Sequence, residues 1–347
     1  MSLPAGTGTA HKAALERSAA PPGRRWWAPD SPAVRTVLPS LFGLAVLTAP
    51  LGVSGYPLRE ATTFLMYMAL ALAWNLIGGL CGYPSFGQVT FFGIGAYTTA
   101  ALLAHTALPF LAVLIASGVV ATVFVAVIGP VVLRLNGHYF AIATLGISQA
   151  LGQIVIGIDW VGGPNGIIVR APFPTPPVYF YYLMAAVFAF ALACTFVILR
   201  GSWGYACRMI RQDEMAAMSC GLNATYYKTA CWALSAFITA LAGGVYALWI
   251  TFLNPPSVFD PAISLTMVVL TLVGGAGTLW GPVVGALLVE TADQYLWAHL
   301  LTLHTLFLGV VVIVIVLFLP RGIWPYLSGR QGMSWRSLFD SMERFRV

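Results

Sequence analysis

Charged side chains are scarce in this sequence. Only 8% of the 347 residues are Asp, Glu, Lys or Arg, and lysine occurs only at Lys12 and Lys228. A soluble domain has charged residues at about 25% of its positions. Because 59% of this chain is hydrophobic instead, we expect an all-α, polytopic transmembrane helical bundle that lies almost wholly in the lipid bilayer.

The motifs that bind nucleotides or carry out hydrolysis are absent. No GxxxxGK[ST] segment occurs, so the sequence has no P-loop to hold the phosphates of ATP. HExxH, GxSxG and close carboxylate pairs on one helix face are also missing, and the five histidines do not cluster. We therefore expect a protein that is not an enzyme and that has no cofactor or metal of its own.

Cysteine is also rare, and its spacing indicates no metal site. The sequence has no CxxC pair. We expect free thiols that fill space between helices, at Cys81, Cys194, Cys207, Cys220 and Cys231. The excess of basic over acidic residues, 17 to 11, comes without a basic surface interleaved with aromatic residues. No nucleic-acid partner is expected.

Long apolar runs predict the membrane spans, since one crossing takes about 20 mostly apolar residues. Such runs lie near 34–54, 58–79, 83–104, 107–133, 138–157, 178–199, 229–252 and 303–319. A further stretch, 262–298, is too long for one span and is interrupted by glycines and by Pro282. It is either one long crossing or a pair of helices that turn at about Thr278.

The distribution of Lys and Arg decides between these alternatives, because basic residues next to spans are held on the cytoplasmic side. Ten crossings leave only Arg59 and Arg170 of the 17 basic residues outside. We therefore predict about ten spans with both termini cytoplasmic. The transmembrane domain covers 34–320, between a disordered cytoplasmic tail at 1–33, which would alternatively suit a transit peptide, and a basic cytoplasmic tail at 321–347.

No ionisable side chain is expected deep inside a span. Glu60, Glu290 and Asp293 are predicted at the outer ends of spans, within reach of water. Transporters driven by protons or ions usually keep an acid or base within the membrane. The driving force is therefore expected from a soluble partner at the cytoplasmic face.

The cytoplasmic segment 200–228 predicts a docking element for such a partner. Asp213 and Glu214 suit the N-terminus of a short helix, and Gly221 suits the position just past its end. Residues at i, i+3 and i+7 form an apolar stripe: Met215, Met218 and Leu222. This stripe fits a groove on a partner or, alternatively, the surface of the bilayer.

Segment 82–97 predicts an interrupted helix. Pro84 and four glycines weaken the helix, which is tolerated only where the freed backbone faces protein or a water-filled cavity. The candidate residues for a translocation pathway are Ser85, Phe86, Gln88 and Thr90. Close helix packing is the alternative. With the second broken stretch, 274–285, this segment suggests an inverted repeat, or else two independent kinks.

The segment 158–177 contains five prolines and predicts an ordered outer loop or a short cap. A tight turn is expected at Gly162, Gly163, Pro164 and Asn165.

Five blocks, in this order, resemble the LivM-type permease of branched-chain amino-acid ABC importers over about residues 58–320. The blocks are Gly82–Tyr97, Leu135–Gly146, Gly162–Gly166, Asp213–Asn223 and Leu272–Pro282. The resemblance implies a bacterial-type cytoplasmic (inner) membrane and a heterodimer with a sister permease. It also implies two ABC ATPase subunits, which bind the ATP, and an extracytoplasmic solute-binding protein.

The resemblance further implies an ATPase-coupling loop, formed by Asp213, Glu214, Met215, Ala216, Ala217 and Gly221. Met215 stands where the family has Glu, and Gln88 stands where it has His, so neither the charge contact nor the imidazole carries over. Related permeases import urea, short amides or aromatic compounds, and the blocks do not separate these solutes. We predict transport by alternating access, with a secondary transporter or a non-transporting membrane scaffold as alternatives.

Overall fold

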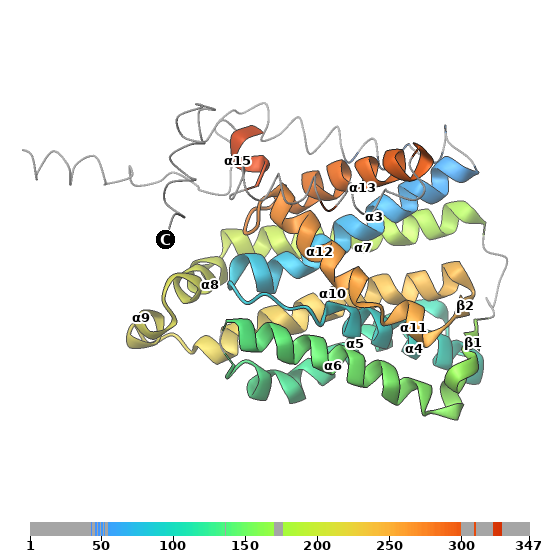
Figure 1. Ribbon diagram of the computed structural model, residues 1–347, viewed down its shortest axis with the longest axis horizontal. Helices are drawn as coiled ribbons and strands as arrows, with labels where there is room; N and C mark the ends of the chain where they lie inside the picture. The colour runs from blue at the N-terminus through green and yellow to red at the C-terminus, as the bar shows by residue number, and fades with distance from the viewer. Residues whose placement is uncertain are drawn as a thin grey trace, which may run out of the picture.

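The computed structural model describes residues 55–135, 137–169, 176–299 and 322–327, together with residue 309 and five single positions between 43 and 52. Its long helices lie roughly along one direction (Figure 1). The short helices α8 and α9 project at one end, and the strands β1 and β2 lie at the opposite end (Figure 1). The described part is a helical bundle, as predicted.

Six helical stretches of the described residues are long and apolar enough to cross a membrane. They are Tyr56–Leu80 (α3, Tyr56–Trp74, and the π-helix η1, Asn75–Leu80), α5 (Phe110–Val132), α6 (His138–Ile156), α7 (Pro177–Arg200), α10 (Ala224–Ile250) and Pro255–Gly274 (α11, Pro255–Val258, and α12, Pro261–Gly274). Each overlaps a predicted span. The predicted spans 34–54 and 303–319 lie almost entirely outside the described residues, so the count of ten stays a prediction.

The first helix break separates η1 from α4 (Gln88–His105), and residues 82–87 are not helical. Neighbouring side chains bond the backbone here: Phe86 N–H donates to the Thr144 hydroxyl (3.1 Å), Val89 N–H donates to the Ser264 hydroxyl (2.8 Å), and Trp74 Nε1 donates to the Ser85 carbonyl (2.8 Å). The break is tolerated because protein groups satisfy it. α4 therefore begins five residues later than the predicted span at 83–104.

The stretch 262–298 contains a second break and is a helical hairpin. α12 ends at Gly274 and α13 (Gly281–His299) begins seven residues later, with the turn at about Thr278 as predicted. Gly274 allows the two helices to pack closely, because any larger residue would place a Cβ against the Gly281 backbone. The alternative of one long helix is wrong.

The segment after α6 is ordered where the structure describes it. Two single 3-10 turns, η2 (Asp159–Val161) and η3 (Gly163–Asn165), form the predicted tight turn, with positive φ at Gly162 (93°) and Gly163 (52°). β1 (Ile167–Ile168) then pairs antiparallel with β2 (Phe252–Leu253), which follows α10. This ribbon joins the ends of α6 and α10.

The position of Glu290 contradicts the expectation of an outer, water-accessible end of a span, and Lys228 of the cytoplasmic segment is also buried. Glu290 is buried and lies nine residues after Gly281, halfway along α13, which packs against α3 and α12. Lys228 is 1% exposed and lies in the second turn of α10, because this helix begins before the predicted span. The distribution of charges predicts the side of the membrane but not the depth. A partner that supplies the driving force can therefore not be inferred from an absence of buried ionisable residues.

Candidate functional site

The short helix α9 (Glu214–Ser219) follows α8 (Ser202–Gln212) and is capped at both ends. Asp213 Oδ1 accepts hydrogen bonds from the N–H groups of Met215 (2.9 Å) and Ala216 (3.0 Å). At the other end, Gly221 has a φ of 85°, and its N–H donates to the Met218 carbonyl (2.9 Å). Both predicted caps are confirmed, and they fix a helix that is too short to be stable in isolation.

One face of α9 is buried and the other is exposed. Ala217 is 1% exposed and packs against Ile210 of α8. Met215 is 70% exposed and Met218 is 44% exposed. Leu222, the third residue of the predicted stripe, packs instead against the cluster that contains Ala217. The apolar surface that α9 presents is therefore that of the two methionines, next to the exposed Ala216.

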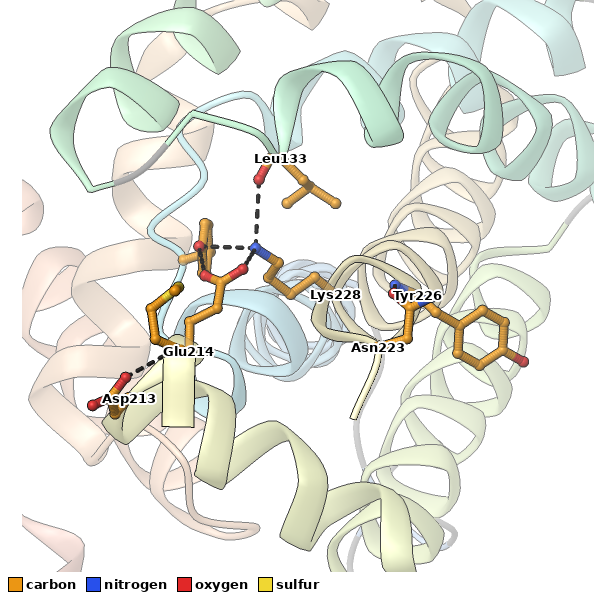
Figure 2. Close-up of polar contacts among 8 residues, drawn as sticks. Leu133, Asp213, Glu214, Asn223, Tyr226 and Lys228 are labelled. Carbon is orange, nitrogen blue, oxygen red and sulfur yellow. Dashed lines mark hydrogen bonds and ion pairs between the residues drawn. The ribbon is translucent and has the colours of Figure 1, made fainter. Parts of the chain in front are cut away.

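A buried ion pair joins α9 to α10. The Lys228 Nζ atom lies 2.6 Å from Glu214 Oε1, 2.9 Å from the Tyr83 hydroxyl and 3.4 Å from the Leu133 carbonyl oxygen (Figure 2). Lys228 is 1% exposed, whereas Glu214 is 27% exposed. The three acceptors match the three N–H donors of the ammonium group, which offsets the cost of burying its charge.

Tyr83 connects this ion pair to the first helix break. Its hydroxyl donates to Glu214 Oε2 while it accepts from Lys228. Burial raises the pKa of Tyr83 above its usual value, and the hydrogen bond to Glu214 raises it further. The phenol therefore stays protonated and remains a donor. Glu214 thus links α9 both to α10 and to segment 82–87.

Two further polar side chains link α8 and the two breaks. Arg211, in the last turn of α8, donates through Nη1 to the Gly79 carbonyl of η1 and lies against Gly277 of the second break. Asn75 is fully buried; its Nδ2 donates to the Thr278 carbonyl (2.9 Å), and its Oδ1 accepts from Gly277 N–H (2.7 Å). The helix pair α8–α9 therefore contacts η1 through Arg211 and the first break through Glu214 and Tyr83, and the second break is bonded to η1, the helix that precedes the first break.

The predicted pathway residues lie inside the bundle. Ser85, Gln88 and Thr90 are at most 1% exposed, and Phe86 is half-buried. Gln88 Nε2 donates to the Ser235 hydroxyl (2.7 Å), but Ser85 Oγ, Gln88 Oε1 and Thr90 Oγ1 have no hydrogen-bond partner among the described residues. The cavity against Thr90 is about 10 Å³, which admits about one water molecule. An amino acid does not fit at these residues in this conformation.

The structure does not bring every predicted site residue together. Gly162, Gly163, Pro164 and Asn165 lie at the β1 end of the bundle, opposite α9 (Figure 1). Sequence analysis also missed Asn75 and Tyr83, and it placed Lys228 at the end of the cytoplasmic segment 200–228 without a role. The available signals were an Asn in an apolar span and one of only two lysines. Their partners lie far away along the chain and could not be inferred.

The profile of a protein family described as "Branched-chain amino acid transport system / permease component" matches residues 56–317. The high-affinity branched-chain amino acid transport system permease protein LivM of Salmonella typhimurium is 30% identical over 327 residues, which cover 84% of this chain and 76% of the relative. The LivM protein of Escherichia coli is 29% identical with the same coverage. No solved structure matches the chain. The family match includes α9, α10 and both helix breaks.

Proposed function

The chain belongs to the family of branched-chain amino acid transport permeases, and from this premise we propose that it carries branched-chain amino acids while α9 couples it to an ATPase. It is a multi-pass membrane protein and the permease component of an ABC importer. Its partners are a sister permease, two ABC ATPase subunits that bind the ATP, and an extracytoplasmic solute-binding protein. It lies in the cytoplasmic (inner) membrane with both termini cytoplasmic.

The contacts of Glu214 support the coupling role most directly. α9 has an exposed methionine face, and its first residue is bonded to Lys228 of α10 and to Tyr83 of the first break. A displacement of α9 by a partner therefore acts on buried groups and not only on a surface loop. Arg211 adds a contact from α8 to Gly79 and Gly277.

The two helix breaks are the proposed moving parts. The helix η1, which precedes the first break, is joined to the second break through the Asn75 side chain. Residues Ser85, Gln88 and Thr90 follow the first break, and each has a buried polar atom without a partner among the described residues. Such atoms cost about 1–3 kcal/mol each in a packed interior. A solute pathway that is closed in this conformation accounts for this cost, since the solute or water bonds these atoms when it opens.

Uptake into proteoliposomes tests the function. We expect the chain, with its sister permease and ATPase pair, to accumulate labelled leucine, isoleucine or valine only with ATP on the ATPase side and solute-binding protein on the other. The purified chain alone should not hydrolyse ATP. Because Glu290 is buried within α13, vesicles with this chain alone are also tested under imposed proton and sodium gradients. Accumulation in those vesicles would overturn the proposal.

Substitution of the α9 methionines tests the docking surface separately. We expect Met215→Glu with Met218→Glu to abolish co-purification of the ATPase subunits. Met209→Glu is the matched control, because Met209 is 42% exposed on α8 and takes no part in the proposed contact. Equal loss in both variants would show that the docking surface is not specific to α9.

A further inference from the structure

Three cysteines that are far apart in the sequence meet in the fold. Cys81 follows η1, Cys207 lies in α8 and Cys231 lies in α10. Their sulfur atoms all lie within 4.8 Å of one another, and those of Cys207 and Cys231 are 3.4 Å apart. All three are free thiols with exposed fractions of 0–1%. All five cysteines are free, but Cys220 is exposed and does not fill space between helices. The absence of a metal-ligand pattern in the sequence did not exclude this cluster.

The spacing of the sulfur atoms fits one metal ion at their centre. Thiolate sulfur lies about 2.3 Å from a d¹⁰ ion such as Zn²⁺. Cu(I) is also a d¹⁰ ion, so about the same Cu–S distance is expected. Three sulfur atoms around such an ion in a plane lie about 4.0 Å apart. The observed separations, from 3.4 Å to at most 4.8 Å, bracket this value. Only small side-chain shifts are needed.

The ligand set selects among metals. Structural zinc sites almost always have four ligands, but among the described residues this cluster contains three cysteines and no His, Asp or Glu. Soft thiolates favour Cu(I), which accepts three sulfur ligands. As two thiolates and one thiol, the complex carries a single negative charge, and the two released protons pass to water. The positive charge of Arg208 acts on Cys207 and balances this complex.

A cavity borders the cluster on the side of Cys81. Cys81 lines a cavity of about 440 Å³ that also borders Gly82, Arg211 and Glu214. An ion carried by a small thiol reaches Cys81 first and is then shared with the two deeper sulfur atoms. We propose that Cys81, Cys207 and Cys231 form a three-sulfur site for Cu(I), which ties α8, the helix before the proposed coupling helix α9, to α10 and to the first helix break.

Titration of the purified full-length chain with Cu(I), in competition with a chromophoric Cu(I) chelator, tests the site. We expect one tightly held ion per chain, and X-ray absorption should show three sulfur neighbours at about 2.3 Å. This measurement uses the unaltered protein and does not depend on whether a variant folds. Two sulfur neighbours, or displacement of Cu(I) by equimolar Zn²⁺, would overturn the proposal.

Substitution to serine assigns the ligands. We expect Cys81→Ser, Cys207→Ser or Cys231→Ser each to weaken Cu(I) binding at least tenfold. Cys194→Ser and Cys220→Ser are matched controls, since these two cysteines lie outside the cluster, and they should bind as the unaltered chain does. Unchanged binding in the first three variants, or loss in Cys220→Ser, would mean that copper binds elsewhere. Because the titration needs neither solute nor ATP, its failure leaves the transport function untouched.

Discussion

Glu214 and Lys228 form an ion pair across 2.6 Å in which the lysine is almost fully buried and the glutamate is 27% exposed. The two residues therefore differ in how well water can solvate the charge that remains when the partner is removed. A glutamate left alone can still be hydrated. A lysine left alone keeps a buried charge with only the Tyr83 and Leu133 oxygens as acceptors.

Removal of the carboxylate is expected to be the more damaging change. Glu214→Leu should destabilise the chain by about 3–5 kcal/mol, because it leaves a buried charge without its counter-charge. Lys228→Met should cost about 1 kcal/mol, since the thioether fills the same space and Glu214 remains partly hydrated. Thermal unfolding in detergent measures both. An equal or reversed order would contradict the assignment of Lys228 as the buried partner.

The bridge made by Asn75 is expected to hold η1, the helix that precedes the first break, against the second break. Asn75→Leu keeps the volume of the side chain but leaves the Gly277 N–H and the Thr278 carbonyl without their partner. A loss of about 1–3 kcal/mol follows for each buried group that stays unpaired. The temperature of thermal unfolding and the rate of solute uptake should both fall. Thr63→Ala is the control, because this hydroxyl bonds only within its own helix on the exposed side of α3, and it should change stability by less than about 0.5 kcal/mol.

Gly221 is expected to matter for coupling through its backbone. Its φ is 85°, and no atom lies within 4 Å of a Cβ built there. Gly221→Val therefore causes about 1–2 kcal/mol of local strain without a collision, and it should distort the end of α9. We expect insertion in the membrane but reduced uptake per ATP hydrolysed.

Gly55 supplies the matched control for that variant. It has a φ of 75° with equally open surroundings, but it precedes α3, far from α9 along the chain. Gly55→Val introduces the same kind of strain and should leave the ratio of uptake to ATP hydrolysis unchanged. Normal coupling in Gly221→Val would remove the coupling role from this residue.

Substitution of Ser85 distinguishes a role in the solute pathway from a role in helix packing. Its hydroxyl is buried without a partner among the described residues, so Ser85→Ala should stabilise the chain slightly, by up to about 1 kcal/mol. If Ser85 lines the pathway, uptake should nevertheless fall several-fold. Ser235→Ala is the comparison, because this hydroxyl has two partners, Gln88 and the Ala73 carbonyl, and its loss should lower stability. Full uptake in a stabilised Ser85→Ala protein would favour packing.

Local chemistry made several elements predictable from the sequence. The turn near Thr278 and the caps of α9 depend on residues within a few positions of one another, such as Asp213 with Met215 and Ala216. These signals do not depend on the rest of the fold. The break after η1 was also expected from Pro84 and its neighbouring glycines, although the start of α4 was not.

The contacts that build the candidate site could not be predicted. Tyr83 and Glu214 are 131 positions apart, and Asn75 and Gly277 are 202 apart. No local pattern indicates which helices will be neighbours. The depth of Glu290 was predicted wrongly for a related reason, since counting basic residues assigns each loop to a side of the membrane and does not locate residues along a span.

α10 is the longest described helix and continues without interruption over 27 residues, a length of about 40 Å. One end begins beside Lys228 and Glu214, and the other leads into β2, whose backbone is paired with β1. Under the proposed coupling role, a displacement of α9 would be transmitted along α10 to the opposite end of the bundle, and the two helix breaks beside it would allow neighbouring helices to change direction. ATP hydrolysis by a partner at one face of the membrane would in this way open the proposed solute pathway at the other.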